Sequence, residues 1–226
     1  MEKEAFQEDK YNRGPYHWMQ IGAPKIQYDL RASIALRFLG DLKGRKALDI
    51  GCGDGKFTSD ILNTGAEVQG VDVSEKALRF AQVLVPEASF HKMDATKLDF
   101  PSESFDAVTL MDVIEHFPDE MAAKVIDEAA RVLKASGTII VSTPSTNLWM
   151  QEAHYRHYTE KTIQETIGRK FESVKVTGYV RTSMFYRKIM KYQNYPVMSR
   201  IARGISKECA PSKAIYLIAS GIRKKP

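Results

Sequence analysis

The sequence predicts an α/β fold in which a mostly parallel sheet of seven strands, the last one antiparallel, carries helices on both faces. Short apolar runs that fit buried strands alternate with segments of helical periodicity, which is the pattern of βαβ units. One apolar run breaks on three closely spaced glycines directly into a helix. Two runs rich in β-branched and aromatic residues follow at 171–180 and 214–219, and fit an antiparallel pair.

The chain is organised around the stretch Lys46–Phe57, which reads KALDIGCGDGKF. Its first half is a short apolar strand, and Gly51, Gly53 and Gly55 then form a turn with almost no side chains. Such a bend lets a ligand approach bare backbone at the carboxyl edge of a sheet. The spacing departs from the dinucleotide pattern G-x-G-x-x-G, because the third glycine arrives one residue early.

The second expected strand, 67–73, carries Asp72, which lies 23 residues after Asp49 at the end of the first strand. An acid at the tip of the second strand can accept hydrogen bonds from both hydroxyls of a ribose. We therefore expect Asp72 to bind the sugar of a nucleoside cofactor.

The other elements follow from helical spacing, capping residues and β-branched runs. Ser74 is expected to cap a helix that runs to about Val85, and Thr159 to begin another. Residues 133–137 are expected to end the helix before the fifth strand. The remaining expected helices are 25–40 and 57–63, and the remaining strands are 88–92, 105–111 and 138–142.

Length and composition set limits on the class of protein. With 226 residues, 43% of them hydrophobic, the chain can bury one large core, so we expect a single domain over 1–226. It has no run of 18 apolar residues and no apolar N-terminal segment, so we expect neither a membrane span nor a signal peptide. Two cysteines argue against a disulfide framework and favour a cytoplasmic location.

The net charge of +5 conceals an asymmetry along the chain. Residues 1–172 hold 21 Lys and Arg against 27 Asp and Glu, whereas residues 173–226 hold 12 basic residues against one acid. Such a basic segment suits an anionic partner such as phosphate, nucleic acid or a phospholipid surface. A solvated basic face that confers solubility is the alternative.

Three further signatures accompany the glycine loop and Asp72 between Lys46 and Pro144. They are Met93-Asp94-Ala95, the stretch FDAVTLMD at 105–112 and the stretch RVLKASG at 131–137. In combination they resemble the class I S-adenosylmethionine-dependent methyltransferases, in particular the methyltransferase type 11 and ubiquinone-biosynthesis O-methyltransferase group. The resemblance implies a Rossmann-like fold, S-adenosyl-L-methionine as the cofactor and S-adenosyl-L-homocysteine as the product.

The resemblance also implies the cofactor contacts. An arginine at the spacing of Arg31 grips the methionyl carboxylate in the family, and a planar guanidinium suits that task; a surface helix arginine is the alternative. Asp94 matches the acid that binds the adenine amino group, although a turn-capping aspartate would look the same. The residues assigned to cofactor binding are Arg31, Asp49, Gly51, Cys52, Gly53, Asp72, Val73, Asp94, Ala95 and Met111.

The segment after the fourth strand carries the candidate base. Methyl transfer from a sulfonium needs an aligned acceptor and removal of the acceptor's proton. His116 is a candidate because an ordinary imidazole pKa of about 6.5 suits neutral pH; a structural Glu-His pair is the alternative. Asp112, Glu115 and His116 also have the spacing of the metal motif in ubiquinone-type and small-RNA 2′-O-methyltransferases, where an ion would lower the pKa of a hydroxyl acceptor. Those families usually have Glu in place of Asp112, so we assign no metal ligand and keep a divalent metal as an alternative.

Two more histidines lie in the loop HYRHYT, which follows the fifth strand at 154–159. Loops at this edge of a doubly wound sheet commonly carry substrate contacts. We therefore predict that His154 and His157 line the acceptor site and share the catalytic role with His116, against a packing role for both.

Two segments of unusual composition flank this core. Residues 1–24 mix aromatics with glycine and proline, and are expected to form an irregular arm that covers the cofactor as a lid or packs on the first helix. The insert 184–212 interleaves basic and aromatic residues. This pattern suits a lid over a hydrophobic acceptor, an anionic membrane surface, single-stranded nucleic acid, or a cap or dimer interface.

We therefore predict a methyltransferase acting at oxygen or nitrogen of a small-molecule or lipid-linked acceptor. An RNA methyltransferase is the first rival, disfavoured because the fourth strand ends in Leu-Met-Asp and not in an N-P-P-Y-like motif. A catalytically inactive cofactor-binding subunit that activates a partner is the second, and a NAD-dependent enzyme is opposed by the glycine spacing. The sequence leaves the acceptor and the oligomeric state open.

Overall fold

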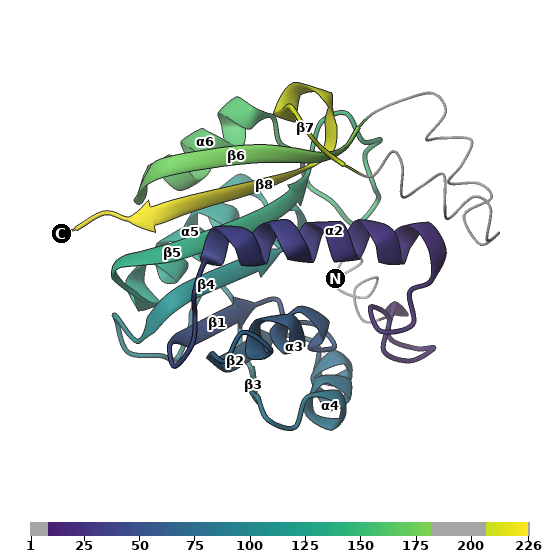
Figure 1. The fold of residues 1–226 in the computed structure, drawn as a ribbon, viewed down its shortest axis with the longest axis vertical. Coiled ribbons are helices and arrows are strands. Elements are labelled where there is room, and N and C mark those ends of the chain that lie inside the picture. The colour runs from purple at the N-terminus through teal and green to yellow at the C-terminus, as the bar shows by residue number, and fades with distance from the viewer. Residues whose placement is uncertain (1–8, 182–206, 226) are drawn as a thin grey trace.

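The computed structural model describes residues 9–181 and 207–225, and these residues build one mixed sheet with helices on both faces (Figure 1). The strand order is β3-β2-β1-β4-β5-β8-β6-β7. The strands are β1 Lys46–Ile50, β2 Glu67–Asp72, β3 Ser89–Lys92, β4 Phe105–Met111, β5 Leu133–Pro144, β6 Phe171–Arg181, β7 Glu208–Cys209 and β8 Ala214–Arg223. The helices are α2 Gly22–Leu39, α3 Lys56–Leu62, α4 Glu75–Leu84, α5 Asp119–Val132 and α6 Glu160–Gly168, with short 3-10 helices η1 Ile114–His116 and η2 Pro211–Lys213.

The first five strands are parallel to one another. Strand β8 runs antiparallel to both β5 and β6, which confirms the expected reversal of the last strand. The sheet has eight strands and not seven, because the two-residue β7 pairs with Gly178 and Tyr179 of β6. Two residues carry no periodicity, so no pattern in the sequence indicates this strand.

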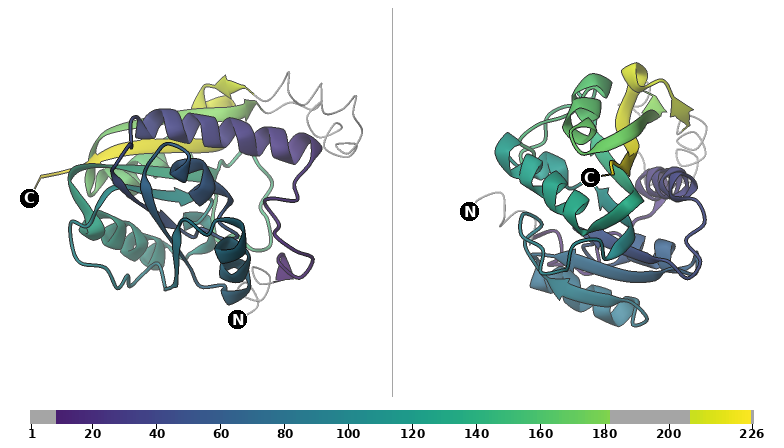
Figure 2. Two further views of the ribbon diagram at one scale, coloured as in Figure 1. Left: turned by 60° about the horizontal axis from the view of Figure 1, so that its bottom comes forward. Right: turned by 90° about the vertical axis from the view of Figure 1, so that its left-hand side faces the viewer.

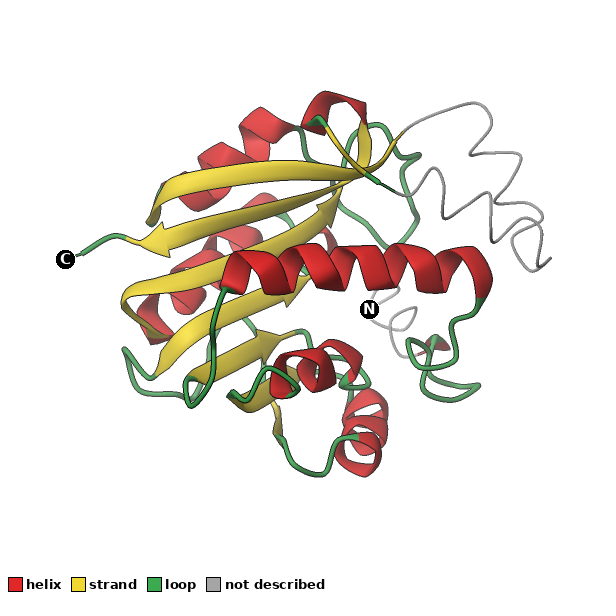
Figure 3. Ribbon diagram, viewed as in Figure 1, coloured by secondary structure: helices red, strands yellow, loops and turns green. Residues whose placement is uncertain are grey.

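The helices form two layers with the sheet between them (Figures 2 and 3). Apolar side chains of α2 and α3 pack on one face of the sheet, and those of α5 and α6 pack on the other. Local capping begins two of the helices as the sequence predicts: Ser74 accepts from the backbone N–H of Ala77, and Thr159 exchanges a capping box with Thr162. Among the described helices, none combines the length and hydropathy needed to cross a bilayer.

The predicted boundary between the last helix before the fifth strand and that strand is wrong. The sequence predicts that this helix ends within 133–137. In the structure α5 ends at Val132, and Leu133 already pairs with Phe105 of β4. The pairing then shifts register before Thr138. Leu133 is fully buried, and a Cβ on Gly137 would come 2.7 Å from its side chain, so the chain folds tightly here as a bulge at the start of β5.

The parallel strands bring the predicted functional segments to one edge of the sheet. Ile50 of β1 lies beside Val71 of β2 and Leu110 of β4, and Met111 lies beside Ser142 of β5. The glycine loop, the end of β2 and the segments after β4 and β5 therefore all lie at the carboxyl edge, where doubly wound sheets bind ligands. Of the insert 184–212, residues 184–206 lie outside the described residues, as do residues 1–8 of the N-terminal arm.

Candidate active site

The glycine loop leaves β1 in a conformation that favours glycine. Gly51, Gly53 and Gly55 have φ of 71°, 56° and 75°, and side chains are strained at such positive values. The backbone N–H groups of Gly51 and Cys52 both donate to the carbonyl of Val71, at 2.8 and 3.0 Å. The loop is therefore fixed against β2 before it enters α3.

Asp72 holds the loop from the end of β2. One carboxylate oxygen accepts from the backbone N–H of Gly53 at 2.9 Å and the other accepts from that of Ser74 at 2.9 Å. Burial raises the pKa of this carboxyl, and the two backbone donors oppose the rise. A carboxylate offers about four acceptor positions, so Asp72 keeps capacity for the two ribose hydroxyls expected from the sequence.

Asp49 and Cys52 are buried residues at the junction of β1 and the loop. Asp49 is only 1% exposed, and its two oxygens accept from the hydroxyls of Thr58 and Thr109 at 2.8 and 2.7 Å. Burial raises the pKa of this carboxyl to about 6. Cys52 is buried with its sulfur 2.9 Å from the position that a Cβ on Gly70 would take, and burial raises the pKa of the thiol. A direct cofactor contact by either side chain stays a prediction.

The remaining cofactor residues of the sequence lie near the ends of β2, β3 and β4. Val73 is 59% exposed beyond β2, whereas Ala95 is buried. Asp94 is exposed, and one of its oxygens accepts from both the backbone N–H and the hydroxyl of Thr96 at 2.8 Å. This is the turn-capping geometry that the sequence allowed as an alternative, and its second oxygen makes none of these bonds. Met111 is the last residue of β4 and packs against the core.

The described part of the N-terminal arm lies against the glycine loop. Asp54 is fully buried, and its carboxylate accepts from the backbone N–H of His17 at 2.7 Å and lies 2.9 Å from the Nδ1 atom of that ring. The indole N–H of Trp18 donates to the carbonyl of Asp54 at 2.9 Å. The hydroxyl of Tyr11 lies 2.5 Å from the position that a Cβ on Gly53 would take. The arm therefore contacts the loop through three aromatic residues, which belong to the segment that the sequence offered as a lid over the cofactor.

Arg31 of α2 reaches the end of β4. Its guanidinium donates to Asp112, whose other carboxylate oxygen accepts from the Ser142 hydroxyl at 2.7 Å. Asp112 has a positive φ of 58°, which is strained for a residue with a side chain. The Nε atom of Arg31 is buried without a hydrogen-bond partner. This arrangement holds a cationic guanidinium at the carboxyl edge of the sheet, and its Nε–H group has no hydrogen-bond partner.

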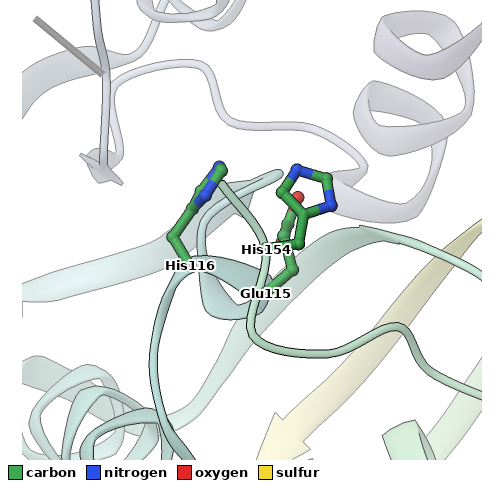
Figure 4. Close-up of side chains that lie close together, drawn as sticks. All are labelled: Glu115, His116 and His154. Carbon is green, nitrogen blue, oxygen red and sulfur yellow. The ribbon is translucent and has the colours of Figure 1, made fainter. Parts of the chain in front are cut away.

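Glu115, His116 and His154 form a cluster of one carboxylate and two imidazoles (Figure 4). Glu115 and His116 come from η1, and His154 comes from the loop after β5; their ligand atoms all lie within 4.8 Å of one another. Glu115 is fully buried, and its Oε1 atom has no hydrogen-bond partner. Its other oxygen accepts from the Thr143 hydroxyl at 3.2 Å. Burial raises the pKa of this carboxyl to about 7.

The loop that carries His154 is tied to the cluster by its backbone and by His157. The N–H of Tyr155 donates to the carbonyl of Glu115 at 2.8 Å. The Nδ1 atom of His154 lies 2.8 Å from the Nε2 atom of His157. The ring centroids of His116 and His154 lie 4.8 Å apart. Burial lowers the pKa of His157. The three predicted catalytic histidines are therefore brought together, although they are separated by as many as 41 residues in the sequence.

The cluster of Glu115, His116 and His154 suits a divalent metal better than the set Asp112, Glu115 and His116, which the sequence spacing suggested. Two imidazoles and a carboxylate are ligands that zinc accepts in catalytic sites. Asp112, which the spacing had grouped with Glu115 and His116, pairs with Arg31 instead. Ligands about 2.0–2.1 Å from a tetrahedral ion lie about 3.3 Å apart, so the three side chains would have to close further around an ion.

The comparison with known families assigns the central part of the chain. Residues 48–141 match the family model described as a methyltransferase domain. The matched residues include the glycine loop, Asp72 and the end of β4. Residues 48–141 are therefore similar to a methyltransferase domain, and they make up less than half of the chain.

Curated proteins similar to this chain include ubiquinone biosynthesis O-methyltransferases. That of Alkalilimnicola ehrlichii is 36% identical over 138 residues, which are 58% of this chain and 55% of the relative. That of Nitrosomonas europaea is 30% identical over 149 residues, which are 62% of either protein. The chain thus spans little more than half the length of these curated relatives.

Solved structures share the fold of this chain. A SAM-dependent methyltransferase from Archaeoglobus fulgidus superposes with a TM-score of 0.67 at 18% identity, covering 97% of this chain and 99% of that one. The magnesium protoporphyrin IX methyltransferase from Synechocystis PCC 6803, solved with bound SAM, gives 0.65 at 21% identity over 99% and 98%. At these identities the likeness establishes the fold.

Sequence reasoning missed several residues that shape this site. Asp54 stands inside the glycine loop, but its burial under the arm depends on contacts 37 residues away in the sequence. Thr58, Thr109 and Ser142 are ordinary strand and helix residues until the fold brings a carboxylate to each.

Proposed function

We propose that this protein transfers a methyl group from S-adenosylmethionine to an oxygen of a small-molecule or lipid-linked acceptor. The observation that carries the proposal is the close approach of the glycine loop to the segment that holds the histidine cluster. A Cβ on Gly51 would lie 2.5 Å from the side chain of Val113, two residues before Glu115. A nucleoside on the loop and an acceptor at the cluster would therefore be neighbours. The names of the ubiquinone-biosynthesis relatives support oxygen as the receiving atom.

The residues at the loop suit the cofactor's three parts. The positive φ angles of Gly51 and Gly53 turn the loop backbone along the carboxyl edge of the sheet, and Asp72 has acceptor capacity for ribose hydroxyls. Asp94 has a second oxygen for the adenine amino group. Arg31 keeps a buried, unpartnered Nε donor for the methionyl carboxylate. When bound, S-adenosylmethionine supplies an electrophilic methyl group on a sulfonium.

The cluster supplies the proton acceptor. As the acceptor oxygen bonds to the methyl carbon, its proton must leave, and His116 or His154 can take it. Glu115 lies next to these rings, and burial raises the pKa of its carboxyl to about 7. It can therefore share or pass on that proton near neutral pH. If a divalent ion binds Glu115, His116 and His154, it would lower the pKa of the acceptor hydroxyl.

Calorimetry with purified protein tests the cofactor half of the proposal. We expect S-adenosylhomocysteine to bind and NAD not to bind. Asp72→Asn should weaken the affinity by about 10- to 100-fold, because a hydrogen bond to a charged group contributes about 1.5–3 kcal/mol. Asp29→Asn, on the exposed side of α2, is the matched control. Binding of NAD in place of S-adenosylhomocysteine would refute the assignment.

Turnover assays test the acceptor half. Phenols with alkyl tails of increasing length, alkylamines and single-stranded RNA are offered with labelled S-adenosylmethionine, with and without excess EDTA. We expect methylated oxygen, and a rate that survives EDTA assigns the proton step to the histidines alone. A product methylated on RNA would favour the nucleic-acid rival. Tight cofactor binding with no transfer to any acceptor would favour an inactive subunit.

A further inference from the structure

The loop after β5 contains a hydrogen-bonded pair of histidines with a defined direction. The Nδ1 atom of His157 lies 3.3 Å from the carbonyl oxygen of Leu148, and its Nε2 atom lies 2.8 Å from the Nδ1 atom of His154. His154 in turn is one of the three side chains of the cluster with Glu115 and His116. His157 itself is outside that cluster, so its contact with the site passes through His154.

The carbonyl of Leu148 determines which nitrogen of the His157 ring carries the proton. A carbonyl oxygen only accepts, so the hydrogen in the contact with Leu148 belongs to the Nδ1 atom of His157. In a neutral ring the Nε2 atom is then an acceptor, and it requires the hydrogen on the Nδ1 atom of His154. His154 is therefore left with an unprotonated Nε2. The same reasoning applies to His116, whose Nδ1 atom lies 3.1 Å from the carbonyl of Ala153.

The backbone holds the deciding carbonyl in place. The N–H of Leu148 donates to the carbonyl of Ser145 at 2.9 Å, which closes a turn directly after β5. The side chain of Asn147 donates from this turn to the carbonyl of Ala214 at 2.8 Å, where β8 begins. Leu148 is buried in the core at 6% exposure. The acceptor for His157 is thus attached to two strands of the sheet.

We propose that His157 is a positioning residue that holds His154 in the tautomer with an unprotonated Nε2 and fixes the orientation of its ring. The inference rests on the proposed function, because it assigns His154 to the acceptor chemistry. It holds equally for a proton-accepting and a metal-binding His154, since both roles need a lone pair on that nitrogen. Packing alone would make no demand on the second nitrogen of His157.

Nitrogen NMR of protein labelled at histidine tests the tautomer without any turnover. The chain has five histidines, so single substitutions assign each ring. We expect His154 and His157 both to carry the proton on Nδ1. In His157→Phe, which keeps a ring but removes the acceptor, His154 should lose this preference; in His157→Gln, whose side-chain oxygen can accept, it should keep it. A wild-type His154 protonated on Nε2, or one unchanged in His157→Phe, would overturn the proposal.

Kinetics give the second readout. We expect His157→Phe to lower kcat by about 10- to 100-fold with little change in KM, as for other groups that orient a reactive imidazole. His157→Gln should recover most of the loss, and His91→Phe, at the far edge of the sheet against Gln69, is the control. A wild type that shows the expected tautomers but no turnover would refute the proposed function and leave the positioning intact. Equal losses in the Phe and Gln variants would refute the positioning.

Discussion

The buried carboxyl of Asp49 makes a prediction that tests the interior of the site directly. It lies in the central strand β1 with both oxygens bonded to threonine hydroxyls, and it has no cationic partner among those contacts. Burial raises its pKa from an ordinary 3.8 to about 6, and the two hydroxyls oppose the rise. The folded protein therefore holds this proton more tightly than the unfolded chain does.

The sign of the pH effect follows from the two pKa values. Between about pH 4 and pH 6 the unfolded chain has lost the proton while the folded protein still binds it, so the free energy of unfolding falls as the pH rises. The two-unit difference corresponds to about 3 kcal/mol once the pH exceeds 7. About 1 kcal/mol of this is already lost at pH 4.5.

Asp49→Asn removes this pH dependence. The amide has the shape of the carboxyl and can bond to hydroxyls that donate or accept. Whatever the baseline change, the variant should gain about 2 kcal/mol over the wild type between pH 4.5 and pH 8. For a chain of this size this corresponds to about 4–8 °C in Tm.

Urea unfolding at pH 4.5 and pH 8 measures the effect. Asp29→Asn replaces an aspartate that pairs with Lys25 on the exposed side of α2, and it should stay within about 0.5 kcal/mol of the wild type at both values. If Asp49→Asn becomes less stable relative to the wild type as the pH rises, the charge of Asp49 is stabilising. The account of its burial would then be wrong.

Three further changes test the surroundings of the loop. Gly53→Ala adds a Cβ 2.5 Å from the Tyr11 hydroxyl at a residue with a positive φ. We therefore expect calorimetry to show at least a tenfold weaker affinity for S-adenosylhomocysteine. Gly168→Ala, whose Cβ would meet open space, is the control and should leave the affinity unchanged. Asp54→Ala removes the acceptor of His17, so trypsin should cut at Lys10 or Arg13 about tenfold faster; an unchanged cleavage rate would show that the arm is held by other contacts. Arg31→Lys keeps the charge but loses the planar fork, so the same affinity should fall about tenfold, and a wild-type value would remove Arg31 from the cofactor site.

The sequence determined the features that depend on neighbours along the chain. Alternating apolar runs set the order of strands and helices, and the glycines at 51, 53 and 55 are required by the backbone angles of the loop itself. Asp72 could be placed because it ends the strand after the loop. Ser74 and Thr159 begin their helices through bonds to residues only three positions away.

Only the tertiary structure decided which distant side chains meet. Arg31 pairs with Asp112 across 81 residues, and that contact takes Asp112 away from the trio its spacing suggested. His154 joins Glu115 and His116 because the loop after β5 bonds to the backbone of η1. Burial of Glu115 and Asp49, which raises the pKa of each carboxyl, depends on what packs around them. A sequence fixes backbone preferences within a few residues, whereas desolvation and long-range pairing arise only when separate elements close over the same space.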